Sequence, residues 1–527
     1  MKQNILVIRL GSLGDIVLTS AALVNLKIKY PRSHLTFLCK EKYAEVVGCM
    51  GTVDEIRAVP DNVGLPAYVR LLMQLDKRNY NFVIDLHGNA RSWMAREAVT
   101  ADRTVRYPKR RLERILAVKG RSLPVSWPHT IDLYNEAVIE AGGAAFCRRP
   151  IMSVPGVVDG EKLESPQLSR HDYVVVAPGA AHENKRWPIE RFVETAVELH
   201  RHRGVSIVWM VTGSDREKES PRARIPTRNF YEAVDCSFAE VLRILSGAAL
   251  TIANDSGIAH ASSAVGVPVI AIFGPTHPTL GFAPRGMYDR VMQVDEYCRP
   301  CSLHGKKPCY RDKRHCFERI SAEMVVAEAS EIHHRRLGEA KAVFVDRDGT
   351  IIRDKNFLSD PDDIEFETGS VEGLRILEQA GFKLVIVSNQ SGVARGFFGA
   401  ETVDRVNGRL LEMLAAGHVD IASVQYCPHH PMGSVNRYAI KCECRKPGAA
   451  MAEDAAHQLG INIRKSYVIG DKLDDVNFGR VVGAQPIMVK TGYGITQAAD
   501  LEGPAFYRGV PVVANLLEAA RMIVSRK

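Results

Sequence analysis

Two aspartates, Asp346 and Asp348, stand one residue apart directly after the apolar run of residues 342–345 (AVFV). Two carboxylates at the end of a buried strand lose hydration, and this costs free energy unless a cation or a reaction compensates for it. One aspartate of such a pair can attack phosphorus, while the other protonates the leaving oxygen and later activates water. The pair therefore indicates phosphoryl chemistry in the last third of the chain.

Polar groups also end or follow other apolar runs of this region, at Ser388-Asn389, Arg445-Lys446 and Gly470-Asp471. Ligands bind at the carboxyl ends of the strands in an open parallel sheet, so these groups are expected to lie close together. Ser388 and Lys446 would bind the transferring phosphoryl oxygens, and Asp471 would join Asp346 in holding Mg²⁺. A single strand-terminal aspartate is more often a helix cap or a turn residue, so the prediction rests on the combination.

Five motifs occur in this region, in the order FVDRDGTI (344–351), VSNQSGVARG (387–396), CPHHP (427–431), CECRKP (442–447) and GDKLDD (470–475). Over about 340 to 520 they resemble the haloacid dehalogenase (HAD) superfamily, and within it the D-glycero-D-manno-heptose 1,7-bisphosphate 7-phosphatases. The resemblance implies a nucleophile at Asp346, a general acid and base at Asp348, and Mg²⁺ on Asp346, the Asp348 carbonyl and Asp471. It also implies contacts to the substrate or its phosphoryl group from Asp354, Phe357, Ser388, Asn389, Gln390, Ser391, Arg445, Lys446 and Lys472.

A Pro-rich loop of the same region carries ligands with the spacing of a structural zinc site, namely Cys427, His429, Cys442 and Cys444. Three thiolates and one imidazole form a closed tetrahedral set. The alternative is a few buried cysteines and a surface histidine, which the two close pairs disfavour, and His430 stays open as a ligand. The phosphatase resemblance also implies zinc here. Because Arg445 follows Cys444, folding around zinc would position the phosphate-binding pair.

A glycine-containing stretch, residues 9–23 (RLGSLGDIVLTSAAL), leads from the first apolar run into a predicted helix. Its glycines let the backbone approach a ligand, and a helix N-terminus favours an anion. The stretch lacks the G-x-G-x-x-G pattern of dinucleotide-binding proteins. Asp15 lies in the first helical turn, where spacing alone favours a capping role over catalysis.

Two later segments carry further candidate ligands for an anion. Residues 177–192 (APGAAHENKRWPIERF) place Lys185 and Arg186 in a loop between a strand and a helix, which suits a diphosphate. Residues 252–278 place Asp255-Ser256-Gly257 at the end of another strand, with His260 one turn into the next helix.

The motifs GSLGD (11–15), DLHGN (85–89), NDSGIAH (254–260) and GPTHP (274–278), with PGA and KRWP between them, span about 1 to 330. They resemble the GT-B glycosyltransferases of family 9, the ADP-heptose:lipopolysaccharide heptosyltransferases. The resemblance implies Asp15 as the base for the acceptor hydroxyl and Lys185 on the donor diphosphate. It also implies contacts to the donor sugar and phosphates from Asp255, Ser256, Gly257 and His260. Ala180 and Ala181 stand where some members carry hydroxyl residues, which leaves the acceptor class open.

Seven of the eleven cysteines fall in two clusters, which favours metal over disulfides in a cytosolic chain. The first cluster consists of Cys298, Cys301, Cys309 and Cys316. A bound metal and reduced thiols packed in a basic loop are equal alternatives for this cluster.

Apolar runs alternate with helix-length amphipathic segments throughout the 527 residues, and this predicts an α/β chain with parallel sheets. The runs form three sets, at 4–10, 34–39 and 81–86, then 173–179, 205–213, 250–255 and 268–274, then 342–346, 383–389, 466–471 and 486–492. The three sets predict three α/β domains, and the two resemblances imply that these are a GT-B pair of Rossmann-like domains, at 1–165 (acceptor) and 166–335 (donor), followed by a HAD-type phosphatase domain with a zinc loop at 341–527. No run is long enough to span a membrane, and the first one predicts a strand rather than a secretion signal.

The net charge of +8 is compatible with anionic substrates or a membrane surface, but no concentrated basic tract favours nucleic acid. We expect a cytoplasmic enzyme, with peripheral attachment to the inner face of the inner membrane as an alternative. Together the resemblances imply two activities of lipopolysaccharide heptose metabolism. One is removal of the C7 phosphate of heptose bisphosphate through an aspartyl-phosphate. The other is heptosyl transfer to a lipid A-core acceptor from a nucleotide-heptose, for which ADP-heptose is the leading candidate. Two alternatives stay open, a histidinol-phosphate-type phosphatase and a GT-B half that acts as a non-catalytic or different-acceptor scaffold.

Overall fold

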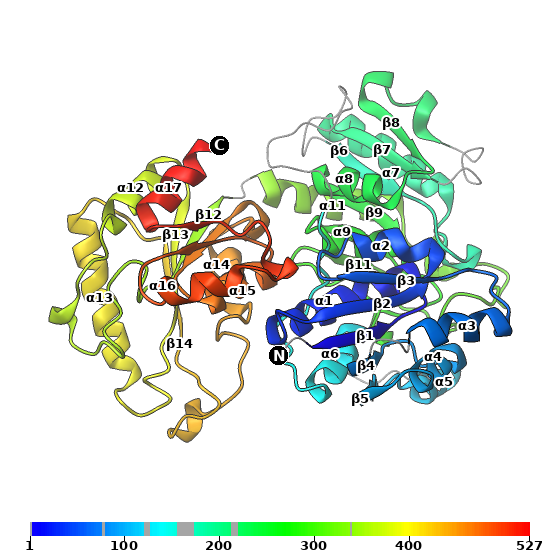
Figure 1. Cartoon of the computed structure of the whole chain (residues 1–527). Helices are drawn as coiled ribbons and strands as arrows, with labels where there is room; N and C mark the ends of the chain where they lie inside the picture. The colour runs from blue at the N-terminus through cyan, green and yellow to red at the C-terminus, as the bar shows by residue number, and fades with distance from the viewer. Residues whose placement is uncertain are drawn as a thin grey trace. The chain divides into compact units, whose positions relative to one another are not determined.

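The structure is a computed structural model that describes residues 3–526 except 76–78, 121–126, 155–172, 212–219 and 338–339. The chain divides into two compact units, Met1–His334 (the N-terminal unit) and Arg335–Lys527 (the C-terminal unit) (Figure 1). The predicted boundary at 165/166 lies outside the described residues, so the division of the first unit into two domains stays a prediction. No helix in the described part of the chain combines the length and the apolar character that crossing a membrane requires.

The first sheet of the N-terminal unit has five parallel strands in the order β3-β2-β1-β4-β5. The strands are β1 (Asn4–Ile8), β2 (His34–Lys40), β3 (Glu55–Val59), β4 (Tyr80–Asp85) and β5 (Ala101–Arg106). The helices around them are α1 (Leu13–Lys29), α2 (Ala44–Gly48), α3 (Leu65–Leu75), α4 (Ala90–Glu97), α5 (Arg111–Gly120) and α6 (Thr130–Glu140). The apolar runs predicted the central strands, whereas the edge strands β3 and β5 were missed because they are less buried and carry charged residues.

The second sheet has six parallel strands in the order β11-β10-β9-β6-β7-β8. The strands are β6 (Tyr173–Ala177), β7 (Ser206–Val211), β8 (Phe230–Val234), β9 (Leu250–Asn254), β10 (Val269–Ile272) and β11 (Arg290–Met292). The helices are α7 (Ile189–Arg203), α8 (Phe238–Gly247), α9 (Gly257–Ala264), α10 (His315–Glu318) and α11 (Ala322–Leu337). Helix α9 packs against α1, since Gly14 lies against the His260 ring and a Cβ there would be 2.7 Å from His260 Cδ2.

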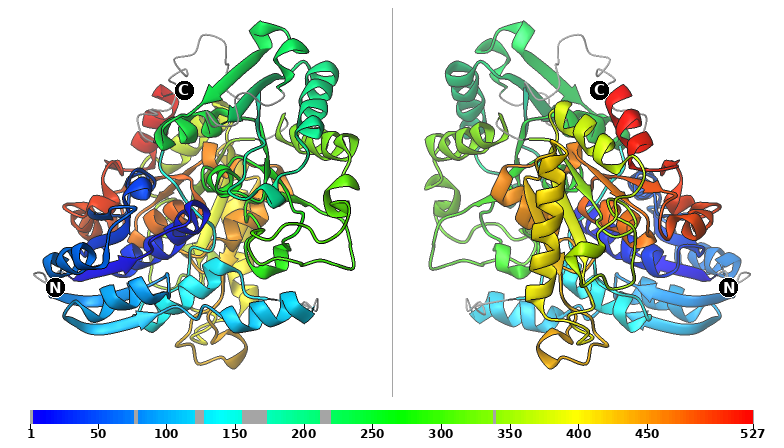
Figure 2. Two further views of the ribbon diagram at one scale, coloured as in Figure 1. Left: turned by 90° about the vertical axis from the view of Figure 1, so that its right-hand side faces the viewer. Right: turned by 90° about the vertical axis from the view of Figure 1, so that its left-hand side faces the viewer.

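The C-terminal unit contains the third sheet, six parallel strands in the order β14-β13-β12-β15-β16-β17. The strands are β12 (Ala342–Val345), β13 (Lys383–Asn389), β14 (Ser423–Cys427), β15 (Tyr467–Gly470), β16 (Gln485–Val489) and β17 (Val512–Val513). The helices are α12 (Ser370–Gln379), α13 (Ala400–Ala416), α14 (Ala450–Leu459), α15 (Leu473–Val482), α16 (Gly494–Gln497) and α17 (Leu516–Ser525). Helices α12, α13 and α17 share one hydrophobic core with the sheet, and α13 crosses the front of this unit in the right-hand view of Figure 2. The predicted α/β architecture with parallel sheets is confirmed.

Candidate active sites

A polar pocket of about 220 Å³ lies at the carboxyl ends of β12 and β13 in the C-terminal unit. The strand order places β12 between β13 and β15, so three chain segments that are far apart in the sequence end at one place. The pocket brings together both phosphatase aspartates and the whole set of predicted contact residues, namely Asp346, Asp348, Asp354, Phe357, Ser388, Asn389, Gln390, Ser391, Arg445, Lys446 and Lys472.

Lys446 holds the predicted nucleophile in place. Its amine donates to Asp346 Oδ1 at 2.7 Å, to Asp475 Oδ1 at 2.6 Å and to the Val387 carbonyl at 2.9 Å, and both ion pairs are almost fully buried. Burial alone would lower the pKa of Lys446, but Asp346 and Asp475 outweigh it and raise this pKa. Asn389 fixes the lysine backbone, because its Oδ1 accepts from the Lys446 N–H at 2.9 Å.

Asp348 forms an ion pair with a buried arginine, Arg347, to which the sequence analysis gave no role. The Arg347 guanidinium, which is 1% exposed, contacts the Asp348 carboxylate at 3.1 Å and donates to Asn407 Oδ1 at 2.8 Å. Gln390 Nε2 donates to Asp348 Oδ2 at 2.8 Å, and Ser388 Oγ lies 3.4 Å from the same oxygen. Burial would raise the pKa of Asp348, but Arg347 and these hydrogen bonds lower it below its usual value.

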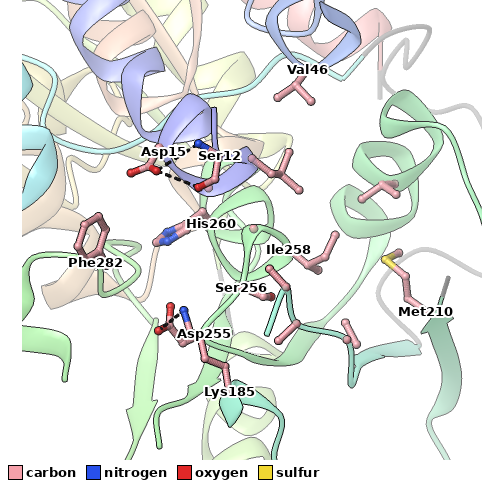
Figure 3. Close-up of a pocket in the computed structure, with 18 of the residues that line it drawn as sticks. Ser12, Asp15, Val46, Lys185, Met210, Asp255, Ser256, Ile258, His260 and Phe282 are labelled. Atoms are coloured by element: carbon pink, nitrogen blue, oxygen red, sulfur yellow. Dashed lines mark hydrogen bonds and ion pairs between the residues drawn. The ribbon is translucent and has the colours of Figure 1, made fainter. Parts of the chain in front are cut away.

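A larger cavity of about 740 Å³ in the N-terminal unit is lined by the start of α1, by the region of α2 and by residues on or after strands of the second sheet (Figure 3). It contains all the predicted transferase residues: Asp15, Lys185, Asp255, Ser256, Gly257 and His260. In Figure 3, Asp15 and Ser12 lie at one end, His260 lies between, and the Lys185–Asp255 pair lies at the other end. The structure thus assembles one pocket from three chain segments, of which the second and third lie about 170 and 240 residues after the first.

The contacts of Asp15 converge on one carboxylate oxygen. Asp15 Oδ2 lies 2.6 Å from the Arg9 guanidinium and accepts from Ser12 Oγ at 2.8 Å and from the Ser12 N–H at 3.3 Å. Burial would raise the pKa of Asp15, but Arg9 and the Ser12 hydrogen bonds lower it. The contact to the Ser12 N–H is the capping contact that spacing favoured, and the same side chain lines the cavity, so the geometry accommodates both predicted roles.

The donor-side residues are partly held by one another. Lys185 Nζ lies 2.5 Å from Asp255 Oδ2, which also accepts from Thr276 Oγ1 at 2.8 Å. Arg186, predicted with Lys185 as a basic pair for a diphosphate, lines the same cavity and donates to the Ala180 carbonyl at 3.0 and 3.1 Å.

Two of these donor-side side chains carry buried atoms without a partner. Among the described residues, Ser256 Oγ and His260 Nδ1 are buried and make no hydrogen bond. Burial lowers the pKa of His260, which favours the neutral ring. Two unpartnered polar atoms beside one cavity are an arrangement that a bound polar ligand would complete.

Comparison with known proteins assigns both units. The model of glycosyltransferase family 9 (heptosyltransferase) matches residues 68–310, and a HAD-hydrolase-like model matches residues 443–519. The D-glycero-beta-D-manno-heptose-1,7-bisphosphate 7-phosphatase of Escherichia coli (strain K12) is 40% identical over 161 residues, which is 30% of this chain and 84% of the relative. The enzyme of the same name from Yersinia pestis is 38% identical over 160 residues and is covered to 85%.

Through its C-terminal unit, the chain belongs to the heptose-1,7-bisphosphate 7-phosphatase family. It also carries a glycosyltransferase family 9 domain, so it is an enzyme with both a glycosyltransferase and a phosphatase part. Among solved structures, E. coli ADP-heptose lps heptosyltransferase II is 18% identical, covers 64% of this chain and 99% of its own, and has a TM-score of 0.48. A second solved structure is D,D-heptose 1.7-bisphosphate phosphatase from B. bronchiseptica complexed with magnesium and phosphate. It is 29% identical, covers 36% of this chain and 99% of its own, and has a TM-score of 0.32.

The phosphatase pocket of this family member has a carboxylate cluster that suits a divalent cation. Carboxylate oxygens of Asp346, Asp471 and Asp475 lie within 4.8 Å of one another, and Asp471 Oδ1 is buried without a partner among the described residues. Burial and the neighbouring carboxylates raise the pKa of Asp471 to about 8 and that of Asp475 to about 6. Three carboxylates so close together repel one another, and Mg²⁺, which prefers carboxylate oxygens, would neutralise this repulsion.

Asp475 belongs to this cluster although the sequence analysis gave it no role. The predicted magnesium set was Asp346, Asp348 and Asp471, with Asp348 acting through its main-chain carbonyl. Asp475 lies four residues after Asp471, in the first turn of α15, and this spacing in GDKLDD was the available signal.

The phosphatase unit also brings the four predicted zinc ligands together. The Sγ–Sγ distances are 3.2 Å (Cys427–Cys444), 3.3 Å (Cys442–Cys444) and 3.5 Å (Cys427–Cys442), and His429 Nδ1 lies 3.3 Å from Cys444 Sγ. Zn–S bonds of about 2.3 Å in a tetrahedron put sulfurs about 3.8 Å apart, so the four groups fit zinc closely. Hydrogen bonds from Cys427 and Cys442 lower the pKa of Cys444 to about 5, which favours a thiolate.

The loop around this cluster also contacts the pocket. Arg445 Nη1 donates to the His429 carbonyl at 3.3 Å, which joins the two segments that carry the ligands. His430 makes other contacts, since its Nδ1 accepts from the Met432 N–H at 3.1 Å.

The other cysteine cluster does not close in the same way. Among the described residues, the groups of metal-ligand atoms within 4.8 Å of one another include none of Cys298, Cys301, Cys309 and Cys316.

Proposed function

We propose that the chain catalyses two reactions of lipopolysaccharide heptose metabolism. In the C-terminal unit it hydrolyses the C7 phosphate of D-glycero-D-manno-heptose 1,7-bisphosphate in a Mg²⁺-dependent reaction through an aspartyl-phosphate. In the N-terminal unit it transfers heptose from a nucleotide-heptose to the lipopolysaccharide inner core, and ADP-heptose is the donor that we propose. The observation that carries the proposal is the convergence of Asp346, Asp348 and Lys446 on one pocket beside a carboxylate cluster.

In the phosphatase reaction, an Asp346 oxygen attacks the C7 phosphorus while the sugar oxygen leaves with a proton from Asp348. Asp348, ionised once it has given its proton to the leaving oxygen, then accepts a proton from the water that hydrolyses the aspartyl-phosphate. Ser388 and Lys446 bind phosphoryl oxygens. Asp346 and Asp471, with the Asp348 carbonyl or Asp475, would hold Mg²⁺, which screens the nucleophile from the anionic phosphate when bound.

In the transferase reaction, Asp15 deprotonates the acceptor hydroxyl that attacks the sugar carbon of the donor. Lys185 faces the donor diphosphate, and Asp255, Ser256, Gly257 and His260 surround the donor sugar and phosphates. The unpartnered Ser256 Oγ and His260 Nδ1 support this placement, because a sugar or phosphate oxygen would satisfy both atoms. In this scheme residues 1–165 carry the acceptor, residues 166–335 carry the donor, and residues 341–527 form the phosphatase.

Zinc in the set of Cys427, His429, Cys442 and Cys444 would be structural, because a closed four-ligand site leaves no position for a substrate. It would hold the segment before Arg445 and Lys446, and so fix the lysine that pairs with the nucleophile.

A substrate panel on the purified full chain tests the proposal. Phosphate release with Mg²⁺ should be fastest on heptose 1,7-bisphosphate, compared with other sugar bisphosphates and histidinol phosphate, and the product should keep its C1 phosphate. Heptosyl transfer should require a nucleotide-heptose, with ADP-heptose preferred over other nucleotides. Preference for histidinol phosphate would reject the phosphatase assignment, and no transfer from any nucleotide-heptose would reject the transferase assignment.

A further inference from the structure

Exposed apolar side chains are concentrated on three consecutive helices of the N-terminal unit. Sixteen large hydrophobic residues are exposed in the described part of the chain, and six of them lie between residues 65 and 116. They are Leu65, Val69 and Met73 on α3, Trp93 on α4, and Leu112 and Leu116 on α5. Exposed apolar side chains that gather on one surface mark a site of interaction, which makes these helices candidates for one.

Helix α5 points its leucines outward and an arginine inward. Leu112 and Leu116 are 70% and 58% exposed and stand one turn apart, so they share one face of the helix. Arg114 is buried instead, with its guanidinium stacked on the Phe282 ring at 5.0 Å and near Thr130 Oγ1 at 3.4 Å. The helix is therefore fixed to the protein through its polar residue and presents its apolar residues to a partner.

The start of α5 shares a basic cavity of about 320 Å³ with α4 and the end of β5. Trp93, Arg96, Arg106 and Arg111 line it, and Trp93 is 55% exposed. The acidic residue at its base, Asp85, is buried and its oxygens already accept from the His87 and Gly88 N–H groups and from Ser92 Oγ. Exposed Lys119 adds positive charge at the end of α5, whereas Arg110 pairs with Glu113 at 3.9 Å and Arg96 with Glu97 at 2.9 Å, so Arg106, Arg111 and Lys119 carry the excess positive charge. Positive charge and apolar side chains thus occur on one surface.

This surface is connected to the transferase cavity by short contacts. Lys109, between β5 and α5, donates to the His87 carbonyl at 3.0 Å. The preceding residue, Leu86, accepts from Arg9 at 2.6 Å, and Arg9 pairs with Asp15. These contacts tie the segment between β5 and α5 to the segment that carries Arg9 and Asp15.

We propose that this surface binds an anionic lipid bilayer. We call it the α4–α5 face, and it consists of Trp93, Arg96, Arg106, Arg111, Leu112 and Leu116. Leucines and a tryptophan enter the interface between headgroups and acyl chains, and arginines pair with lipid phosphates. Three apolar side chains expose far less than the roughly 800 Å² per partner of a stable protein interface, so a bilayer fits better than a second protein. The consequence for catalysis rests on the proposed function: binding presents Asp15 to a lipid-linked acceptor.

Vesicle flotation with the full chain tests this face. The wild type should bind vesicles of phosphatidylcholine with phosphatidylglycerol, lose binding as salt rises, and not bind pure phosphatidylcholine vesicles. Arg106→Gln with Arg111→Gln should weaken binding about 30-fold, at about 1 kcal/mol per basic residue near an anionic surface. Leu112→Gln with Leu116→Gln should weaken it about tenfold or more.

Matched controls come from exposed residues elsewhere. Arg224→Gln with Arg228→Gln removes two charges, Ile495→Gln removes one apolar side chain that is 75% exposed, and neither should change binding. All variants should keep the wild-type melting temperature. Absence of binding to phosphatidylglycerol vesicles, or equal loss in the controls, would overturn the proposal. So would binding of inorganic phosphate that requires Arg106 and Arg111 without any vesicle binding, because the cavity would then be a small-anion subsite.

Transfer assays separate this proposal from the proposed function. The Leu112→Gln/Leu116→Gln variant should transfer heptose normally to a water-soluble acceptor sugar and more slowly to an acceptor embedded in vesicles. Equal rates of this variant and the wild type on both acceptors would overturn the role of the face. A wild type that binds vesicles but transfers to neither acceptor would reject the transferase function and leave the lipid-binding face standing.

Discussion

Replacing Asp15 by asparagine separates the two roles that geometry allows for this residue. The amide oxygen can still accept from Ser12, so the helix cap is largely kept. The ion pair with Arg9 is lost, and the Arg9 side chain is only 7% exposed. Breaking a buried pair from one side costs about 3–5 kcal/mol, and since Asp15 is 20% exposed we expect the lower end, about 3 kcal/mol. If Asp15 is the base, heptosyl transfer should also fall by about 10²–10⁴-fold.

The stability change should depend on pH in a defined direction. Burial raises the pKa of Asp15, but Arg9 and Ser12 lower it by more, so the folded pKa lies below the ordinary value. A carboxylate with a depressed pKa stabilises the fold fully above its unfolded pKa of about 4 and loses this effect as pH falls through the folded value. The difference in unfolding free energy between wild type and Asp15→Asn should therefore be complete at neutral pH and become smaller below about pH 4.

The assay combines heptosyl transfer at saturating donor with melting curves of the same proteins. Ser12→Ala is the matched control, because it removes the hydroxyl contact to Asp15 and leaves the carboxylate. We expect it to cost about 0.5–2 kcal/mol of stability and to keep near-normal turnover. Near-normal turnover of folded Asp15→Asn together with a lowered melting temperature would refute the base and leave only the structural role.

Three substitutions test the C-terminal unit. Asp346→Asn should abolish phosphate release, because an amide is a poor nucleophile and a weaker metal ligand, while heptosyl transfer persists in the other compact unit; loss of both activities in a folded variant would contradict the two-enzyme assignment. Cys442→Ser should lower the melting temperature, release about one zinc ion per chain in metal analysis and slow phosphate release; a metal-free wild type with full activity and the same melting would exclude zinc. Gly349→Ala should slow phosphate release, since φ is +84° there and a Cβ would meet the Asp471 carboxylate; an unchanged rate would mean that this carboxylate can move without cost.

The sequence predicted the elements whose signal is local. The central strands are continuous apolar runs because both faces of a parallel sheet are covered, and Asp346 and Asp348 follow such a run directly. The zinc ligands could be predicted because they form two close pairs within one loop. Edge strands such as β5 could not be predicted in this way, because residues on a half-covered edge carry charges and break the apolar pattern.

The sequence could not determine which side chains far apart in the chain contact one another in the folded protein. Lys446 reaches Asp346 and Asp475 because the strand order puts β12 between β13 and β15, and no local pattern contains that order. The same holds for Asp15 and the Lys185–Asp255 pair, which line one cavity although they lie about 170 and 240 residues apart in the sequence. Motif spacing determines which chemistry a chain can perform, because reactive groups sit at the ends of local elements. Only tertiary packing decides which of these groups are buried, paired and charged, because hydration and neighbouring charge are set by residues far away in the sequence.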